Sequence, residues 1–199
     1  PRSAIPTRKL PGLLAIVPGN TQGRGTGLAR QLLPAGASVM LVGRNREAGS
    51  ALARELGERC RFAVCNVELD EDIDDCIDAT LAAFGRLDIL VNNACVYDDQ
   101  GLQSDRAQWL STLNINLVSA AIFVQKAAPH MREGGTVINI GSTNAERMPF
   151  GGGGTYAMSK AALVGLTKGL ARDLGPRGIT TNNVQPGPGD TDMNPAHSV

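Results

Sequence analysis

Tyr156 and Lys160 form the pair of side chains with the clearest chemical potential, because the segment YAMSK places a phenol and an ammonium four residues apart. On a helix, two residues with this spacing share one face. A phenol titrates near ~10, so it is a poor acid–base catalyst at neutral pH unless nearby positive charge stabilises its phenolate. The pair predicts a proton-exchanging tyrosine tuned by a lysine. A solvent-exposed Tyr–Lys pair on a helix is the alternative.

Two hydroxyl residues, Ser142 and Thr143, follow the apolar run TVINIG at 136–141. If this run is a strand, they lie at the carboxyl edge of a sheet, where open α/β folds bind ligands. A hydroxyl there can donate to a substrate carbonyl oxygen and stabilise its developing negative charge. Ser142 is favoured over Thr143 because it directly follows the Ile-Gly strand end.

A glycine-rich loop, PGNTQGRG at 18–25, connects the apolar run LLAIV at 13–17 to an expected helix. Glycines permit a tight turn and a close backbone approach to a ligand, while the helix N-terminus stabilises the charge of a pyrophosphate. The spacing is G-x-x-x-G-x-G rather than the commoner G-x-G-x-x-G. The loop therefore indicates a dinucleotide site, with an ordinary turn as the alternative.

The elements that must position these residues follow from an alternation of short apolar runs with amphipathic stretches. Several runs are apolar on successive residues, as expected for strands covered on both faces. Such alternation predicts a parallel sheet wound by right-handed crossovers. Pro34 should end the first helix near Leu33, Asp70 should cap the third, and Gly175-Pro176 should stop the last. The expected strands are 13–17, 38–43, 61–67, 87–93, 136–141 and 179–187, and the expected helices are 24–35, 46–58, 70–84, 105–132 and 155–175.

Length and composition limit the classes of function. The 199 residues suffice for one domain with a substantial core, and residues 1–9 are expected to form a loose N-terminal arm. Nineteen basic residues balance nineteen acidic ones, which argues against a nucleic-acid or membrane partner, and no apolar run approaches the ~20 residues of a membrane span. Four cysteines form no CxxC pair, so we expect reduced thiols in a cytoplasmic protein and no metal site.

The order of the motifs resembles that of the short-chain dehydrogenases/reductases, from about Lys9 to Met193. PGNTQGRG matches the family's T-G-x-x-x-G-x-G cofactor loop, NNAC at 92–95 its N-N-A-G segment, and YAMSK its Y-x-x-x-K. NIN at 114–116 supplies the family's helix asparagine, and VQPGPGDT at 184–191 its proline–glycine segment. The resemblance implies an α/β fold with a Rossmann-type doubly wound parallel sheet, in a single NAD(P)-binding domain over residues 1–199.

The resemblance also implies a catalytic tetrad of Asn116, Ser142, Tyr156 and Lys160. Tyr156 would exchange a proton with a carbonyl or alcohol, while the cofactor carries the hydride. Ser142 would position the substrate oxygen. Lys160 would lower the pKa of Tyr156 and hold the nicotinamide ribose, and Asn116 would anchor a water that links Lys160 to solvent.

The end of the second expected strand, VGRN at 42–45, bears on the choice of cofactor. An acidic residue there usually holds a free 2′-hydroxyl, whereas an arginine suits a 2′-phosphate. Arg44 favours NADP over NAD, with Asn45 as a second donor, and a solvated arginine is the alternative. The cofactor-binding set implied by the family is Gly19, Asn20, Thr21, Gln22, Gly23, Arg24, Gly25, Arg44, Asn45, Asn66, Val67, Asn93, Ala94, Cys95, Tyr156, Lys160, Pro186, Gly187 and Thr191.

Four residues depart from the family pattern, and all of them concern cofactor binding. Pro18 replaces a threonine and removes a backbone donor. Arg24 replaces an apolar residue and must reach water or a phosphate, because burying an unpaired guanidinium is costly. Asn66 replaces an aspartate, and Cys95 replaces a glycine, where its side chain crowds the backbone.

Together these features predict an enzyme that transfers a hydride between NADP(H) and a small-molecule carbonyl or secondary alcohol, as a homodimer or homotetramer. Family members continue beyond the segment at which this chain ends, through a substrate-covering loop and a last helix and strand, so a C-terminal part is expected to be missing. One alternative is a non-catalytic nucleotide-binding or regulatory protein on the same fold. A purely structural, oligomer-forming member is another.

Overall fold

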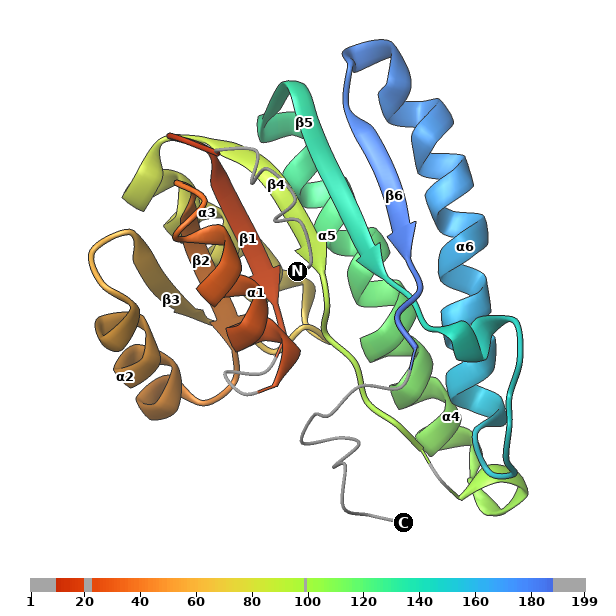
Figure 1. Cartoon of the computed structure of the whole chain (residues 1–199). Helices are drawn as coiled ribbons and strands as arrows, with labels where there is room; N and C mark the ends of the chain where they lie inside the picture. The colour runs from red at the N-terminus through yellow and green to blue at the C-terminus, as the bar shows by residue number, and fades with distance from the viewer. Residues whose placement is uncertain (1–9, 20–22, 99, 188–199) are drawn as a thin grey trace, which may run out of the picture.

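The computed structural model describes residues 10–19, 23–98 and 100–187. Its centre is one six-stranded sheet, in which all neighbouring strands pair in parallel (Figure 1). The strand order β3-β2-β1-β4-β5-β6 reverses between β1 and β4, as in a doubly wound nucleotide-binding sheet. The strands are β1 (Leu14–Pro18), β2 (Ser38–Gly43), β3 (Cys60–Val64), β4 (Leu87–Asn92), β5 (Met131–Ile140) and β6 (Thr180–Val184).

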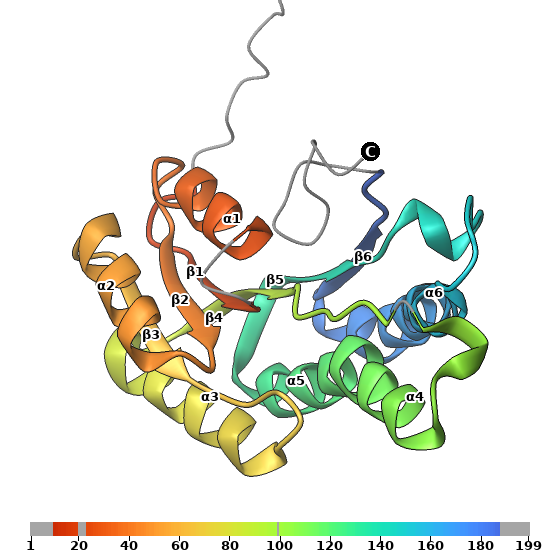
Figure 2. The ribbon, with the colours of Figure 1, turned by 90° about the horizontal axis from the view of Figure 1, so that it is seen from below.

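Helices cover both faces of this sheet (Figure 2). On one face, α1 and α2 pack over the half formed by β1 to β3, and on the other lie α3, α5 and α6. All five residues of β1 are buried, which explains why its sequence is apolar on successive positions. The predicted Rossmann-type fold is therefore confirmed. The helices are α1 (Arg24–Leu32), α2 (Arg46–Leu56), α3 (Asp70–Phe84), α4 (Arg106–Leu113), α5 (Ser119–Ala127) and α6 (Gly154–Leu174).

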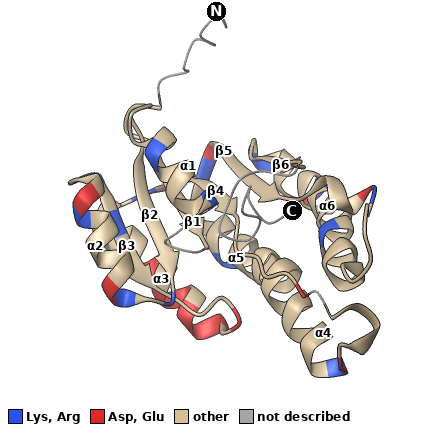
Figure 3. Cartoon of the chain, turned by 60° about the horizontal axis from the view of Figure 1, so that its bottom comes forward, with Lys and Arg blue, Asp and Glu red and all other residues tan. Residues whose placement is uncertain are grey.

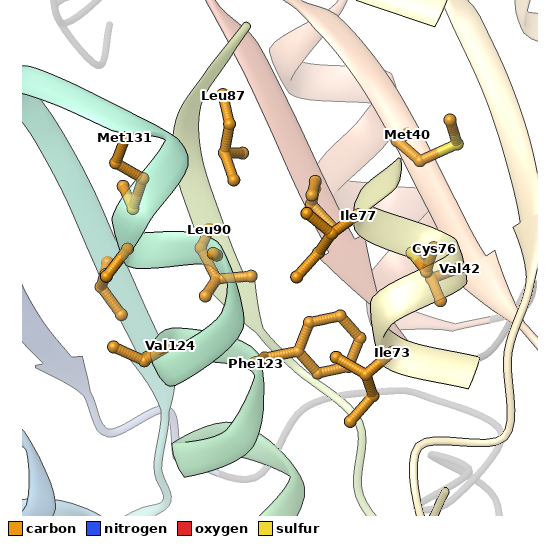
Figure 4. Close-up of a cluster of buried hydrophobic side chains, with 14 of the residues drawn as sticks. Met40, Val42, Ile73, Cys76, Ile77, Leu87, Leu90, Phe123, Val124 and Met131 are labelled. Carbon is orange, nitrogen blue, oxygen red and sulfur yellow. The ribbon is translucent and has the colours of Figure 1, made fainter. Parts of the chain in front are cut away.

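Two apolar clusters, one on each face, hold the helices on the sheet. The larger one joins Ile73 of α3, Leu90 of β4 and Phe123 of α5, all of them buried (Figure 4). Burying each such side chain contributes about 1.5–3 kcal/mol. The smaller cluster lies under α1 and α2, where Gly49 lets α2 approach β3 so closely that a Cβ would collide with the ring of Phe62.

Several helix ends match the signals in the sequence, and one does not. The helix α1 ends at Leu32, just before Pro34, and α6 ends at Leu174 before Gly175-Pro176, as predicted. The prediction that Asp70 caps α3 is wrong, because Leu69 occupies the cap position and Asp70 is the first helical residue. Acidic side chains do gather at the start of α3, where the helix dipole favours them (Figure 3).

The expected single helix at 105–132 is divided in the structure. A π-helical turn, Asn114–Val118, separates α4 from α5, and α5 ends at Ala127. Pro129 explains that end, because it has no N–H to continue the helical ladder. Strand β5 then begins at Met131, earlier than predicted, with a register shift against β4. Strand β6 ends at Val184, short of the expected 187, just before Pro186.

The helical run 106–130 has the length and mean hydropathy, 1.3, of a membrane-spanning helix, contrary to the expectation that no run comes close. Its α5 part is a core helix, because Phe123, Val124 and Ala127 are buried in the larger apolar cluster. Arg106 and Lys126 also lie within the run. Packing against the sheet thus accounts for the apolar residues of the α5 part, whereas Trp109, Leu110 and Val118 earlier in the run are exposed.

Candidate active site

The carboxyl ends of β1 and β4 meet where the strand order reverses, at the lower edge of the sheet in Figure 1. Gly19 follows β1 with a φ of 142°, and a Cβ there would collide with the amide of Asn93 after β4. That amide donates to the carbonyl oxygen of Pro18 at 3.4 Å. The first loop and the segment from Asn93 to Cys95 therefore lie side by side at the crevice where open α/β sheets bind ligands.

The N-terminus of α1 opens onto the same crevice. Gly23 occupies its cap position with a φ of 63°, and no described side chain caps the helix. A helix N-terminus that opens onto such a crevice can stabilise an anion. Arg24 is exposed, as its guanidinium requires, and Gly25 is buried. Asn20, Thr21 and Gln22 lie outside the described residues.

Tyr156 and Lys160 share one face of α6, as their spacing predicts. Both are buried, with exposed fractions of 6% and 2%, so they are not a solvent-exposed pair. The Lys160 ammonium donates to the Ile140 carbonyl oxygen at 2.8 Å, at the end of β5, and lies 5.7 Å from the centroid of the Tyr156 ring. This hydrogen bond fixes the Lys160 nitrogen beside the phenol.

The ionisation of this pair is controlled mainly by burial. Burial raises the pKa of Tyr156 above its usual value, the Cys95 side chain raises it further, and a hydrogen bond with Ser142 and the charge of Arg24 oppose the rise. Burial also lowers the pKa of Lys160. The side chains of the protein by themselves thus keep the phenol protonated, whereas the sequence led us to expect a lowered pKa.

Ser142 and Thr143 differ in the structure. Ser142 is buried, its oxygen accepts from the Asn144 N–H at 3.1 Å, and its hydroxyl opposes the rise in the pKa of Tyr156. Thr143 is exposed, and its N–H donates to the Pro186 carbonyl oxygen at 3.1 Å. Ser142 is therefore the hydroxyl that meets the phenol. Pro186 lies against the same strand end with Gly187 next to it in sequence, and Thr191 is outside the described residues.

Asn116 joins the segment after β4 to α6. Its Oδ1 accepts from the Val96 N–H at 2.8 Å, and its Nδ2 donates to the Val96 carbonyl oxygen at 2.9 Å and to Ser159 Oγ at 3.1 Å. Ser159 in turn donates to the Tyr156 carbonyl oxygen at 2.7 Å. The side chain of Asn116 thus acts as a clamp. Sequence analysis missed Ser159, although it lies inside YAMSK.

Two more residues surround the phenol. The ring of Tyr97 packs against the ring of Tyr156, with centroids 5.0 Å apart and planes tilted by 56°. Cys95 is half-buried, its Sγ donates to the Val96 carbonyl oxygen at 3.5 Å, and its side chain helps to raise the pKa of Tyr156. Sequence analysis did not identify Tyr97 as a site residue. Its position two residues after Cys95, in the segment that follows β4, was the one signal that could have indicated it.

The remaining predicted cofactor residues lie at the ends of β2 and β3. Arg44 is exposed directly after β2. The oxygen of Asn45 accepts from the Ala48 N–H at 3.0 Å and caps α2, which leaves its amide NH₂ as the donating end. The oxygen of Asn66 accepts from the Glu68 N–H at 3.3 Å, so it is engaged in a local turn. Val67 packs against the larger apolar cluster.

Comparison with known proteins places this geometry in context. The short chain dehydrogenase pattern matches residues 13–198. The chain is 39% identical to the cyclic-di-GMP-binding biofilm dispersal mediator protein of Escherichia coli, over 94% of this chain and 77% of that protein. It is 35% identical to the 3-oxoacyl-[acyl-carrier-protein] reductase FabG of the same organism, over 94% and 78% of the two chains.

A solved structure shows the same architecture. A short-chain dehydrogenase from Burkholderia cenocepacia in complex with NADP superposes with a TM-score of 0.92 and 40% identity, over 96% of this chain and 80% of that one. The family pattern, the relatives and the strand order agree with one another. The chain belongs to the short-chain dehydrogenase/reductase family of oxidoreductases.

Proposed function

We propose that this protein transfers a hydride between NADP(H) and a carbonyl or secondary-alcohol substrate, with Tyr156 as the proton donor and acceptor. The observation that carries the proposal is the meeting of Ser142, Tyr156 and Lys160 beside the crevice between β1 and β4. Two hydroxyl groups that could meet a substrate oxygen and an ammonium that could stabilise the phenolate support this proposal.

The residues around the crevice fit a dinucleotide. Gly19 and Gly23 keep the backbone open, and the N-terminus of α1, which no described side chain caps, suits a pyrophosphate. Arg44 stands where a 2′-phosphate would be recognised, which favours NADP over NAD, and Asn45 offers an amide donor next to it. When bound, the cofactor supplies the hydride and a positively charged nicotinamide in its oxidised form.

The side chains of the protein supply orientation and a proton. Because burial keeps Tyr156 protonated, its hydroxyl is ready to donate to a substrate oxygen during reduction. Ser142 donates to the same oxygen and stabilises its developing charge. Lys160, fixed by the Ile140 carbonyl, favours the phenolate that remains after the transfer. The hydrogen bonds of Asn116 and Ser159 hold α6 in a fixed position relative to the segment after β4.

The test is a cofactor titration followed by turnover measurements on a panel of ketones and aldehydes, with Tyr156→Phe as the variant. We expect turnover to fall by about 10²–10⁴-fold while NADPH affinity changes by less than about twofold, because the variant removes only the proton. Retained turnover in Tyr156→Phe would contradict the assignment. We further propose a homodimer or homotetramer, which light scattering of the chain will measure.

A second candidate is a nucleotide-binding regulatory protein on the same fold. Two observations favour it: a relative at 39% identity is described as cyclic-di-GMP-binding, and Arg24 stands exposed at the N-terminus of α1. Calorimetric titration with cyclic-di-GMP, using the native chain and Arg24→Ala, tests it. Binding that is lost in Arg24→Ala, together with no turnover on any carbonyl, would support this candidate against the oxidoreductase. If no dinucleotide raises the melting temperature, both fail and a structural role is left.

A further inference from the structure

The segment after β4 and the loop before α6 meet beside the buried phenol, and glycines make the meeting possible. A Cβ at Gly101 would stand 2.9 Å from the Cα of Gly152. A Cβ at Gly153 would collide with the methyl group of Met148 and stand 2.7 Å from the hydroxyl oxygen of Tyr97. The φ of Gly153 is −92°, which does not require glycine. The missing side chain at Gly153 therefore serves to make room for Tyr97 and Met148.

Tyr97 is held in this place from two directions. Its ring packs against the ring of Tyr156, with centroids 5.0 Å apart and planes tilted by 56°, which is a favourable arrangement for an aromatic pair. The preceding residue, Val96, has both its N–H and its carbonyl oxygen bonded to the side chain of Asn116. The ring thus stands at a fixed distance from the phenol and covers the first turn of α6.

The surface that Tyr97 and Met148 offer is largely apolar. Both residues are half-buried, so part of the ring and part of the thioether chain stay accessible. The carboxylate of Asp98, the next residue after Tyr97, accepts from the Ser104 hydroxyl at 2.5 Å and from the Gln100 N–H at 3.1 Å, so it is bound within its own segment. Aromatic rings and thioethers both interact favourably with another aromatic ring.

We propose that Tyr97 and Met148 form one wall of the carbonyl site, and that this wall selects ketones with an aromatic ring attached to the reacting carbon. The proposal rests on the proposed function for one point, that Tyr156 and Ser142 hold the carbonyl oxygen. Such a ring begins two bonds from that oxygen, so it must lie close to the phenol. The ring of Tyr97, already packed beside the phenol, is the surface that it would contact.

The wall would act on binding rather than on proton transfer. It touches the substituent of the carbonyl and leaves the reacting oxygen to the hydroxyl groups. An interaction made equally with the bound substrate and with the transition state lowers KM and leaves kcat unchanged. A saturated ring of the same size lacks the flat π-face, so it gains less from the wall. The expected signature is therefore a KM that depends on the aromaticity of the substituent.

The first experiment compares acetophenone with cyclohexyl methyl ketone, which has nearly the same size, in steady-state reduction by NADPH. Tyr97→Leu keeps an apolar side chain without the ring. It should raise the KM for acetophenone by about three- to tenfold and that for cyclohexyl methyl ketone by less than about twofold. Tyr97→Phe restores the ring and should restore the preference for acetophenone. Equal changes for the two ketones, or a loss confined to kcat, would mean that Tyr97 only positions Tyr156, and would overturn the proposal.

A pair of neighbouring glycines tests the wall without touching either of its side chains. Gly153→Ala places a methyl group where Tyr97 and Met148 now pack, so it should raise the KM for acetophenone by about threefold. A Cβ at Gly154 would meet no described atom within 4 Å outside its own helix, so Gly154→Ala is the matched control and should change this KM by less than about twofold. If the two variants raise the KM equally, the wall does not lie over Gly153 and the proposal fails.

Binding measured without turnover separates this proposal from the proposed function. Saturation-transfer NMR of the full chain with added NADP⁺ detects bound acetophenone directly. If the native chain reduces no ketone but binds acetophenone about three- to tenfold more tightly than Tyr97→Leu does, only the reductase is refuted. If the native chain reduces ketones and Tyr97→Leu binds acetophenone equally well, only the wall is refuted.

Discussion

The two sides of the crevice, to which we assign proton transfer and dinucleotide binding, are built in different ways. Ser142, Tyr156 and Lys160 are buried and linked by hydrogen bonds to β5, to the π-helical turn and to the segment after β4. On the other side, Arg24 and Arg44 are exposed, and the oxygens of Asn45 and Asn66 bond only to amides a few residues away.

The contrast explains where this chain departs from its family. Proton transfer depends on the positions of a few atoms, so the groups that perform it are fixed by contacts from several elements. A dinucleotide is recognised through backbone amides, a helix terminus and exposed charge, which tolerate changes in side chains. Pro18, Arg24 and Asn66 lie on the tolerant side. Cys95, half-buried in the segment after β4, stands at the border between the two sides.

The largest loss of turnover among the variants that compare the two sides is expected at Ser142. Replacing it by alanine removes the hydroxyl that meets the phenol, so turnover should fall by about 10²–10³-fold. The exposed neighbour Thr143, replaced by alanine, should change turnover by less than about twofold. Steady-state kinetics on one ketone measures both, and equal losses would show that the two hydroxyls are interchangeable.

A smaller loss is expected when the clamp is opened. Asn116→Ala leaves the Val96 amide and Ser159 without their partner, which should lower the free energy of unfolding by about 1–3 kcal/mol and turnover by about tenfold. Asn114 is exposed in the same NIN segment and serves as the control. Chemical denaturation and kinetics measure the two losses. If Asn114→Ala matches Asn116→Ala, the clamp does not position the site.

On the dinucleotide side, Arg44→Asp should change the preference between NADPH and NADH rather than the turnover rate. Losing a charge-assisted contact to the 2′-phosphate weakens binding by about 1.5–3 kcal/mol, so the preference for NADPH over NADH should fall by about 10- to 100-fold. Turnover at saturating cofactor should be retained. Arg54→Asp, in the last turn of α2, is the matched control. An unaltered ratio in Arg44→Asp would mean that another residue reads the phosphate.

The smallest expected effect is the dependence of stability on the ionisation of the Tyr156 phenol at high pH. In Tyr97→Phe, Tyr156 is the remaining tyrosine, so absorbance titration reports its phenol alone. Burial raises its pKa, so it should ionise above ~10, the value it regains in the unfolded chain. Its contribution to stability is fully present below ~10 and is lost as pH rises toward the folded pKa. Added NADP⁺ should lower the midpoint, and a midpoint below ~10 without cofactor would contradict the dominance of burial.

The sequence predicted what depends on local pattern. The alternation of short runs with amphipathic stretches predicted all six strands, and several of these runs are apolar on successive residues. Proline and glycine positions gave the ends of α1 and α6. The sequence pattern did not predict where the expected helix at 105–132 is interrupted, because its residues stay apolar across the interruption. The π-helical turn at Asn114–Val118 follows from packing, and the early start of β5 follows from Pro129, which ends the helical run. Asp70 failed as a cap because the chain enters α3 one residue earlier.

By itself, the sequence determined the fold class, the family and the residue types of the site, because apolar periodicity and motif spacing are local properties of the chain. Only the tertiary structure decided which of these residues meet. It buried Ser142 while leaving Thr143 exposed, used Asn116 as a clamp, and packed the ring of Tyr97 against that of Tyr156. The physical reason is that burial and contact between β4, β5 and α6 are set by the packing of the sheet, which no local pattern records.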